Sequence, residues 1–302
     1  MKRITFAIFL SVIFSIETAN LSYAQQQSIS IWVRKSGSYI DGGNPGKLNQ
    51  ITISQPSLSK KIRALRIYDA QYDKDMQYRG VYLSQVLDGY PKKAGVDTAL
   101  LHFANGMIIP ITTSKDLKNI FIALSYKKNK KWSYDFPQLE KIDDIYYRKD
   151  PNPTKFFGNK VVNLAEKKLN KGKINNFSPW NHCNSLIGIE LVNENAYFNQ
   201  FEISKDKEII AGFEVFKARC QFCHGVKQVG ASFGWDYADP LKISKKRGKK
   251  NLHFFVKYPK ATAFKQGLQM PNQIDVTEKE TDQLWKWIDL ISSKSPNIYK
   301  LP

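Results

Sequence analysis

The sequence predicts two folded domains, the first a mixed α+β domain that is mostly β and the second an all-α domain. The chain has 302 residues, of which 42% are hydrophobic and 24% charged, which is typical of a globular protein long enough for two cores. Strand-like segments dominate before residue 205, and apolar residues at helical spacing dominate after it. The polar stretch Ser204-Lys205-Asp206-Lys207 separates the two patterns. We therefore expect domains over residues 25–205 and 206–302.

Residues 1–24 have the plan of a secretory signal peptide. Lys2 and Arg3 precede the apolar run Ile4–Ile16, and Ser22 and Ala24 place small residues before a cleavage site. A retained membrane anchor is the alternative, but this run is short for a membrane span, and no later segment reaches the length that one needs. We expect an exported, periplasmic protein with no transmembrane anchor after cleavage.

The first domain is expected to consist mainly of strands. Asn105-Gly106 is a strong hairpin-turn signal between the apolar segments Leu100–Phe103 and Met107–Ile111. Val81–Leu87 and Asp116–Tyr126 have the apolar spacing of helices. The other expected strands are Ser28–Arg34, Arg63–Asp69 and Leu186–Val192.

The second domain is expected to contain three helices. Ile209–Arg219 and Asn251–Lys257 form the first two, and Pro259 ends the second. The third begins with the capping box Thr277-Glu278-Lys279-Glu280, in which the Thr277 hydroxyl and the Glu280 carboxylate each serve a free backbone N–H. It presents one apolar face, made of Leu284, Trp287, Ile288 and Ile291.

The segment Cys220-Gln221-Phe222-Cys223-His224 carries the chemistry. It matches C-x-x-C-H, the attachment signature of c-type haem. Two cysteines on one turn can both reach the vinyl groups at one edge of a porphyrin, and the adjoining histidine can then bind the iron. A thioredoxin-like redox pair would need a preceding strand, and a zinc site would need further ligands at suitable spacing. The remaining cysteine, Cys183, and the remaining histidines, His102, His182 and His253, lie far from the motif in the sequence.

The surrounding residues are similar to those of class I cytochromes c. Gly212 and Phe216 precede Cys220 on one helical face, as do a glycine and an aromatic residue in that family, and Met270-Pro271 resembles its Met-Pro loop. The resemblance implies an all-α cytochrome c fold for residues 206–302 and one haem c bound covalently by Cys220 and Cys223. It also implies that His224 and Met270 are the axial ligands of the iron, with His253 as the rival to Met270.

The same resemblance implies supporting roles for residues around the haem. A proline carbonyl after the haem-binding helix accepts the N–H of the axial histidine in this family, and Pro240 is the matching residue for His224. Phe216, Leu268 and Trp287 are expected to keep the pocket dry.

Residues 60–195 resemble the sulfite-oxidase-type molybdopterin fold in the order and spacing of their strands. The resemblance rests on Arg66–Asp69, Tyr78–Leu83, Leu101–Ile111, Trp180 and Ile187–Leu191. A cysteine thiolate binds molybdenum in the enzymes of that family. No cysteine lies between residues 24 and 182, and Cys183 does not match the ligand position. We therefore expect a sulfite-oxidase-like domain without molybdopterin, and a buried structural thiol at Cys183.

The chain is strongly basic, with 46 Lys and Arg against 27 Asp and Glu, a net charge of +19. Removal of Lys2, Arg3 and Glu17 with the signal peptide leaves +18. The basic runs at 127–131 and 245–250 could suggest nucleic acid, but export argues against that partner. An acidic redox protein, or a periplasmic dehydrogenase or oxidase, fits better, since opposite charge speeds encounter; solvated loops are the simpler interpretation of both runs.

The sequence as a whole predicts an exported monohaem c-type cytochrome, a carrier of single electrons rather than a catalyst. Two enzymatic or sensory alternatives remain open. One is a periplasmic molybdenum-dependent oxidoreductase with a fused haem domain. The other is a haem peroxidase or sensor, which would have an open sixth position on the iron.

Overall fold

The structure is a computed structural model of the whole chain. The residues that it describes are 28–33, 39–40, 44–45, 49–54, 58–69, 74–88, 96–133, 159–165, 178–201, 204–227, 229–238, 248–262 and 270–294. The expected signal peptide at 1–24, the residues Pro240 and Leu268, and positions 245–247 of the second basic run lie outside this set. We refer to the described residues up to 201 as the N-terminal region and to those from 204 as the C-terminal region.

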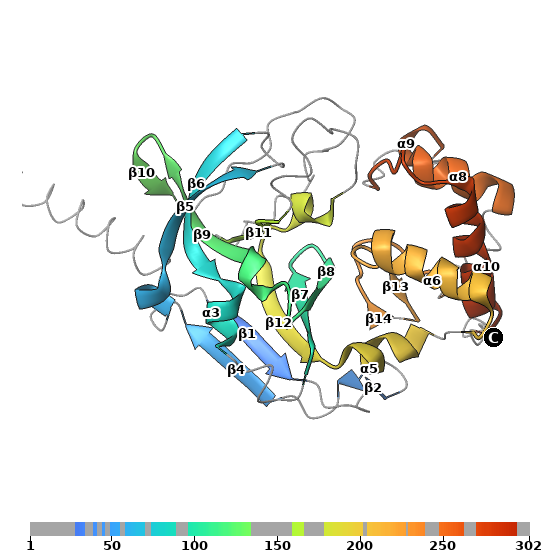
Figure 1. Cartoon of the computed structure of the whole chain (residues 1–302), viewed down its shortest axis with the longest axis horizontal. Helices are drawn as coiled ribbons and strands as arrows, with labels where there is room; N and C mark the ends of the chain where they lie inside the picture. Colours follow the sequence, from blue (N-terminus) through green and yellow to red (C-terminus); the bar gives the residue numbers. More distant parts are fainter. Residues whose placement is uncertain are drawn as a thin grey trace, which may run out of the picture.

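One sheet of the N-terminal region has five strands in the order β4-β1-β12-β7-β8 (Figure 1). β1 and β12 are parallel, and the other neighbours are antiparallel. The strands are β1 (Ser28–Val33), β4 (Asn49–Ser54), β7 (Thr98–Phe103), β8 (Ile108–Thr112) and β12 (Leu186–Val192). The expected hairpin turn between β7 and β8 is confirmed: the Gly106 N–H donates to the Phe103 carbonyl, and Gly106 has a φ of 88°.

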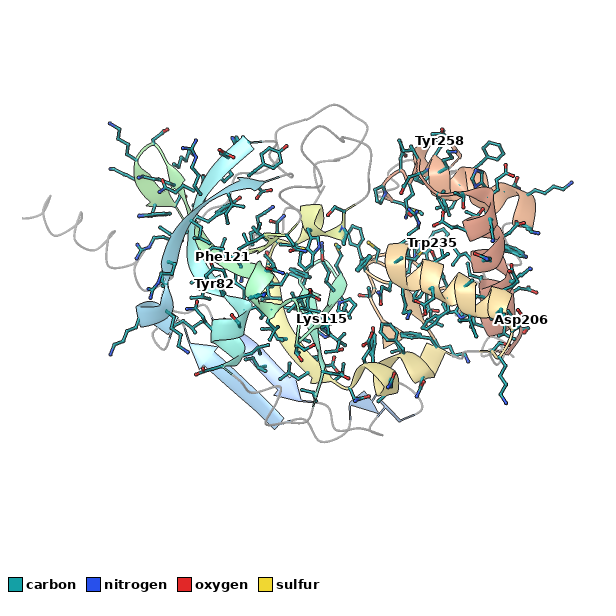
Figure 2. All side chains as sticks on the ribbon, viewed as in Figure 1. Tyr82, Lys115, Phe121, Asp206, Trp235 and Tyr258 are labelled. Atoms are coloured by element: carbon teal, nitrogen blue, oxygen red, sulfur yellow. The ribbon has the colours of Figure 1, made fainter. Side chains whose placement is uncertain are left out.

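The second sheet is antiparallel and curled, in the order β10-β9-β6-β5, with β11 also paired to β9 (Figure 1). Its strands are β5 (Arg63–Asp69), β6 (Lys74–Tyr82), β9 (Ile120–Lys128), β10 (Lys131–Ser133) and β11 (Lys160–Asn163). An irregularity between Arg79 and Gly80 bends β6, and a Cβ on Gly80 would overlap the Ile122 carbonyl. Tyr82 and Phe121 pack edge to face on this sheet, with ring centroids 5.4 Å apart (Figure 2).

Short elements connect the strands. They are β2 (Tyr39–Ile40), β3 (Asn44–Pro45), η1 (Ser59–Lys61), α3 (Leu83–Leu87), η2 (Leu117–Asn119), η4 (Pro179–His182), α5 (Glu194–Phe198) and η5 (Asn199–Phe201).

The helix expected over Asp116–Tyr126 is wrong, because only η2 is helical and β9 follows it. Residues 120–126 are all buried, so both faces of this strand are covered. Because this run is apolar on both faces of the strand, its apolar residues do not alternate with polar ones. Their spacing therefore does not distinguish a helix from a strand.

The two sheets enclose a common core. Ile31, Leu101 and Ile189 from the first sheet and Val81 and Ile122 from the second belong to one cluster of buried side chains. Alternate residues of β7 and β12, such as Leu100 and Val192, point out of this core toward the C-terminal region.

The C-terminal region contains helices and a short hairpin. The helices are α6 (Lys207–Arg219), α8 (Lys249–Lys257), α9 (Pro259–Thr262) and α10 (Glu278–Lys294), and the hairpin is β13 (Gly225–Val226) with β14 (Val229–Gly230). The helical spacing expected over 209–219 and 251–257 and after the capping box is confirmed. The expected all-α cytochrome c fold is wrong, because strands lie between the helices and the whole chain is mixed α/β.

The core of the C-terminal region is shared with the N-terminal region. A single cluster of buried side chains joins Phe213, Phe216 and Trp287 of α6 and α10 to residues that precede α6. The residues contributed from before α6 are Leu100, Val192, Tyr197, Phe198 and Phe201. The helices therefore do not enclose a core by themselves, which is a second departure from the expected all-α unit.

Candidate functional site

The C-x-x-C-H segment forms the turn that ends α6. The helix begins at Asp206, whose side chain accepts hydrogen bonds from the Glu208 and Ile209 N–H groups (Figure 2). At the other end, the Cys220 N–H donates to the Phe216 carbonyl, so Cys220 is the last residue held by the helix. The Cys223 and His224 N–H groups both donate to the Cys220 carbonyl, at 3.1 and 2.9 Å. Two thiols and one imidazole are thereby fixed on a single turn.

Both cysteines of this turn are free thiols of low acidity. Cys220 is buried and Cys223 half-buried. Burial raises the pKa of Cys220 to about 11 and that of Cys223 to about 12. Their position at the C-terminal end of a helix also disfavours a thiolate, because the negative end of the helix dipole lies there. A redox C-x-x-C pair has the opposite arrangement, with a thiolate stabilised at a helix N-terminus.

The imidazole of His224 is oriented by the backbone. Its Nδ1 lies 2.6 Å from the Trp235 carbonyl oxygen, and since a carbonyl only accepts, Nδ1 carries the proton. Burial lowers the pKa of His224, an effect that the Trp235 carbonyl and the charge of Asp236 oppose, so the neutral ring is favoured at neutral pH. Nε2 then holds the lone pair that binds a metal. The role expected for the Pro240 carbonyl is thus filled by that of Trp235.

Gly234 and Tyr237 both pack against the imidazole ring of His224. A Cβ on Gly234 would lie 2.5 Å from Cε1 of His224, so only glycine lets the backbone pass this close to the ring. The ring of Tyr237 lies 4.6 Å from that of His224, centroid to centroid. Its hydroxyl is hydrogen-bonded to the Cys220 thiol.

The loop after the hairpin β13–β14 is folded back onto the turn by main-chain bonds. The Gly234 N–H donates to the Cys223 carbonyl at 2.6 Å, and the Tyr237 N–H donates to the Gly225 carbonyl at 3.0 Å. Asp236 holds the loop from inside, because its Oδ1 accepts from the Lys227 and Ala238 N–H groups. This folding brings Trp235 and Tyr237 to the imidazole.

An aromatic cluster lies behind the turn. Phe216 packs on Trp287 with ring centroids 4.6 Å apart, and Phe213 packs on Trp287 at 5.5 Å. Gly212 allows this contact between α6 and α10, because a Cβ there would overlap the Gln283 carbonyl. Within the described residues, the buried Nε1 of Trp287 has no hydrogen-bond partner.

Met270 and His253 approach the same cluster from different elements. Met270 is half-buried and packs against the cluster that contains Cys220 and Trp287. His253, on α8, lies with its Nδ1 3.2 Å from the Thr281 hydroxyl of α10. Met270 thus packs against the same buried cluster to which Cys220 belongs, and His253 is engaged with α10.

Arg219 ties the segment after Met270 to the turn. Its guanidinium bonds both oxygens of Asp275 at 3.2 Å and Oε1 of Glu280 at 3.1 Å. Its carbonyl also accepts from the Gln273 side chain. Arg219 was not among the residues predicted from the sequence. Its position beside Cys220 at a helix end is visible there, but its acidic partners, 56 and 61 residues away, are not.

The β7–β8 hairpin of the N-terminal region also contacts the turn. The Ile108 N–H donates to the carbonyl of Phe222, between the two cysteines, at 3.1 Å, and the Ser232 N–H donates to the Gly106 carbonyl at 2.8 Å. Phe222, Cys223 and Phe233 pack against the core between the sheets. The Asn105-Gly106 pair predicts the hairpin, but nothing in the sequence predicts that this hairpin contacts the C-x-x-C-H turn.

Cys183 is separate from this site. It is buried in the core between the sheets, and its thiol donates to the Pro179 carbonyl. The expectation of a buried structural thiol is confirmed. The expectation of a domain without molybdopterin stays a prediction.

The donors on the turn are the thiols of Cys220 and Cys223 and the imidazole of His224. Across the described ranges, no three His, Cys, Asp or Glu side chains are grouped to hold one metal ion, so the two thiols and the imidazole do not converge. Thioether bonds at a porphyrin edge and one nitrogen at the iron need no such convergence. Three buried polar atoms lack a hydrogen-bond partner among the described residues: Nε1 of Trp287 and the Oε1 atoms of Gln221 and Gln273. Each could therefore form a hydrogen bond with a bound group.

Comparison of the chain with protein families, with curated proteins and with solved structures finds no match. None of the helices within the described ranges has the length and apolarity that crossing a membrane requires.

Proposed function

We propose that this chain binds one haem covalently through Cys220 and Cys223 and carries single electrons as an exported c-type cytochrome. In this proposal His224 and Met270 would be the protein ligands that hold the iron, and the partner is an acidic redox protein or a periplasmic dehydrogenase or oxidase. One observation carries the proposal: the Nδ1 of His224 is committed to the Trp235 carbonyl, while two free thiols lie within the preceding turn. That leaves Nε2 for a metal and both sulfurs for covalent attachment.

The residues around the turn have defined tasks in this proposal. The Trp235 carbonyl keeps the proton on Nδ1, and Gly234 packs on the ring of His224, so the imidazole keeps one tautomer and one orientation. Phe216 and Trp287 exclude water from the covalent edge, where Cys220 is buried. The Nε1 of Trp287 offers a hydrogen bond to an acceptor on the bound group.

We assign the second iron ligand to Met270, with His253 as its rival. Met270 packs against the cluster that contains Cys220, and its Met-Pro pair resembles the ligand loop of class I cytochromes c. His253 lies on α8 with its Nδ1 3.2 Å from the Thr281 hydroxyl of α10, which leaves its Nε2 unengaged by that contact. A haem held there would supply an iron that gains and loses one electron. If His224 and Met270 both hold the iron, the chain would favour electron transfer over chemistry on an iron-bound substrate.

The two other interpretations of the C-x-x-C pair have less support. A dithiol–disulfide exchange protein needs an acidic attacking thiol, and burial raises the pKa of both thiols here. A structural zinc site needs four converging ligands, and no three are grouped among the described residues.

The test is covalent attachment. The full chain, produced in a host that exports it and attaches c-type haem, should keep its absorption after acid–acetone extraction and run as a haem-staining band under denaturing conditions. Cys220→Ala/Cys223→Ala should lose both signals, and Cys183→Ala is the matched control that should keep both. If the double variant keeps a haem that resists extraction, or the parent chain never acquires one, the proposal is wrong.

A second measurement separates a six-coordinate carrier from a peroxidase or sensor. The ferric protein should show the weak red charge-transfer band of methionine ligation, and Met270→Leu should abolish it while preserving the apolar contact. His253→Gln should leave the band in place. Rapid binding of carbon monoxide to the reduced parent protein would instead indicate an open sixth position and overturn the assignment of Met270.

A further inference from the structure

The hairpin β9–β10 protrudes from the curled sheet at the end of the molecule opposite to α10 (Figure 1). Lys127 and Lys128 end β9, Lys130 lies in the turn and Lys131 begins β10. All four side chains are exposed. We call them the four tip lysines.

The four tip lysines form no ion pair within the part of the chain that the structure describes. The ion pairs of that part join other residues, as when Asp75 pairs with Arg66. Among the described residues, the tip is therefore a concentration of positive charge without a paired carboxylate.

Two features show that the local structure does not favour lysine at these positions. Asn129 and Lys130 have φ values of 47° and 68°, and the second position of such a two-residue turn normally takes glycine. Lys128 and Lys131 are direct cross-strand partners, where like charges repel each other. A glycine in the turn and an acidic residue opposite a lysine would each give a more stable hairpin. Folding preference thus does not explain the positive charge at the tip.

The base of the hairpin adds an amphipathic aromatic side chain. Trp132 is the cross-strand partner of Lys127, and the guanidinium of Arg79 lies over its ring, 5.4 Å from the centroid. A tryptophan flanked by cations suits the layer between lipid headgroups and acyl chains, where its ring and its N–H meet different surroundings.

We propose that the tip of the β9–β10 hairpin is a docking site for an anionic phospholipid surface. The charges surround a projecting tip: Lys127 shares one face with Trp132, Lys128 and Lys131 share the other, and Lys130 lies between them. This arrangement suits a laterally uniform layer of phosphates, whereas an acidic protein would require one complementary face. The site lies on the N-terminal sheet, at the end of the molecule opposite to α10, whereas the C-x-x-C-H turn follows α6 of the C-terminal region, so docking leaves that turn free for a redox partner.

This inference does not depend on the proposed haem, because the hairpin belongs to the N-terminal sheet. Its test is co-sedimentation of the full chain with vesicles of phosphatidylcholine containing phosphatidylglycerol, compared with vesicles of phosphatidylcholine alone. All variants carry the same N-terminus, so that differences report the substituted residues.

Replacing all four tip lysines by glutamine should lower the partition coefficient for the anionic vesicles by about tenfold or more, since each lysine near such a surface contributes to binding. Arginine at the same four positions should retain binding. The matched control replaces the exposed Lys205, Lys207, Lys250 and Lys279 of the C-terminal region by glutamine, and it should change the coefficient by less than about threefold.

An equal loss in the tip variant and in the control would show that net charge alone drives binding, and would overturn the proposal. So would a tip variant that loses binding to soluble polyglutamate but not to the vesicles, because the tip would then serve an acidic protein. Unchanged thermal unfolding of the tip variant checks that the hairpin is intact.

Discussion

The Nδ1 atom of His224 lies 2.6 Å from the carbonyl oxygen of Trp235, eleven residues further along the chain. The bond closes a loop that begins at the C-x-x-C-H turn, runs through β13 and β14 and returns to the imidazole. Because the carbonyl belongs to the backbone, the orientation of the ring depends on the path of the loop rather than on one side chain. Glycine at 234 makes that path possible, and this leads to the first prediction.

Gly234→Ala should displace the ring of His224. The added Cβ would lie 2.5 Å from Cε1 and 2.7 Å from Nδ1, so either the ring or the loop must move and the bond to Trp235 is lost. We expect stability to fall by about 2 kcal/mol. In protein that carries the proposed haem, we also expect a fall in the low-spin fraction, since loss of such an orienting bond weakens metal binding about 10–100-fold. Ser232→Ala, at an exposed position in the same loop, should change neither the urea midpoint nor the visible spectrum.

Gly212→Ala should separate α6 from α10. Alanine normally stabilises a helix relative to glycine, but here the Cβ would overlap the Gln283 carbonyl and lie 3.0 Å from Cβ of Trp287. We expect a net loss of about 2–3 kcal/mol in the free energy of unfolding, measured by urea titration. Gly248→Ala is the control, because a Cβ there meets no atom within 4 Å, and it should cost about 0.5 kcal/mol or less. Equal effects at the two positions would contradict the close contact.

The two thiols should resist alkylation in protein prepared without haem. With pKa values of about 11 for Cys220 and 12 for Cys223, both should react with iodoacetamide at pH 8 about 100-fold more slowly than in the denatured chain. Because these folded-state pKa values lie above the unfolded ones, their contribution to stability is complete below about pH 8.5 and is lost as pH rises. Mass spectrometry against time measures the rates, and fast labelling of the folded protein at pH 8 would refute the prediction.

Glu280→Gln should reduce stability at neutral pH and make little difference in acid. Burial alone would raise the pKa of Glu280, but hydrogen bonds from Thr277 and the charge of Arg219 outweigh it and lower the pKa. A lowered carboxyl pKa contributes stability above the unfolded value, and that contribution disappears as pH falls through the folded value. Glutamine keeps the capping hydrogen bonds, so the expected loss of about 0.5–1 kcal/mol at pH 7 reports the ion pair with Arg219.

Thermal unfolding across pH 3 to 7 measures this difference between Glu280→Gln and the parent chain. The two curves should converge as the pH falls through the folded-state pKa of Glu280, because the parent carboxyl then becomes neutral as well. Asp275→Asn removes the other carboxylate that contacts Arg219 and should also lower stability at pH 7. A gap that stays constant with pH would show that packing, not charge, is responsible.

The features that the sequence predicted correctly are those set by neighbouring residues. The capping box forms as expected: Glu280 Oε2 accepts from the Thr277 N–H at 2.8 Å, and the Thr277 hydroxyl accepts from the Glu280 N–H at 3.2 Å. The strand expected at Arg63–Asp69 has the same bounds as β5. Both depend on alternation or on a spacing of three residues, which the sequence displays directly.

The errors arose where burial by distant segments decides the outcome. Residues 120–126 form a strand because both faces are covered, and the sequence does not show what covers them. The C-terminal region is not all-α because its helices share a core with Leu100, Val192 and Tyr197 and so do not close on each other. The resemblance to class I cytochromes c rests on a few helical positions, and those positions do not determine how the helices of the whole region pack.

The candidate site divides in the same way. The sequence by itself determined that two thiols and an imidazole lie on one turn, because a spacing of three residues and then one is local geometry. Only the tertiary structure decided that the Trp235 carbonyl orients His224, that Ile108 bonds the carbonyl of Phe222, and that Glu280, already the cap of α10, also holds Arg219. These contacts join residues that neither spacing nor composition pairs, because a backbone carbonyl is present at every position and only the folded path selects which one meets the ring.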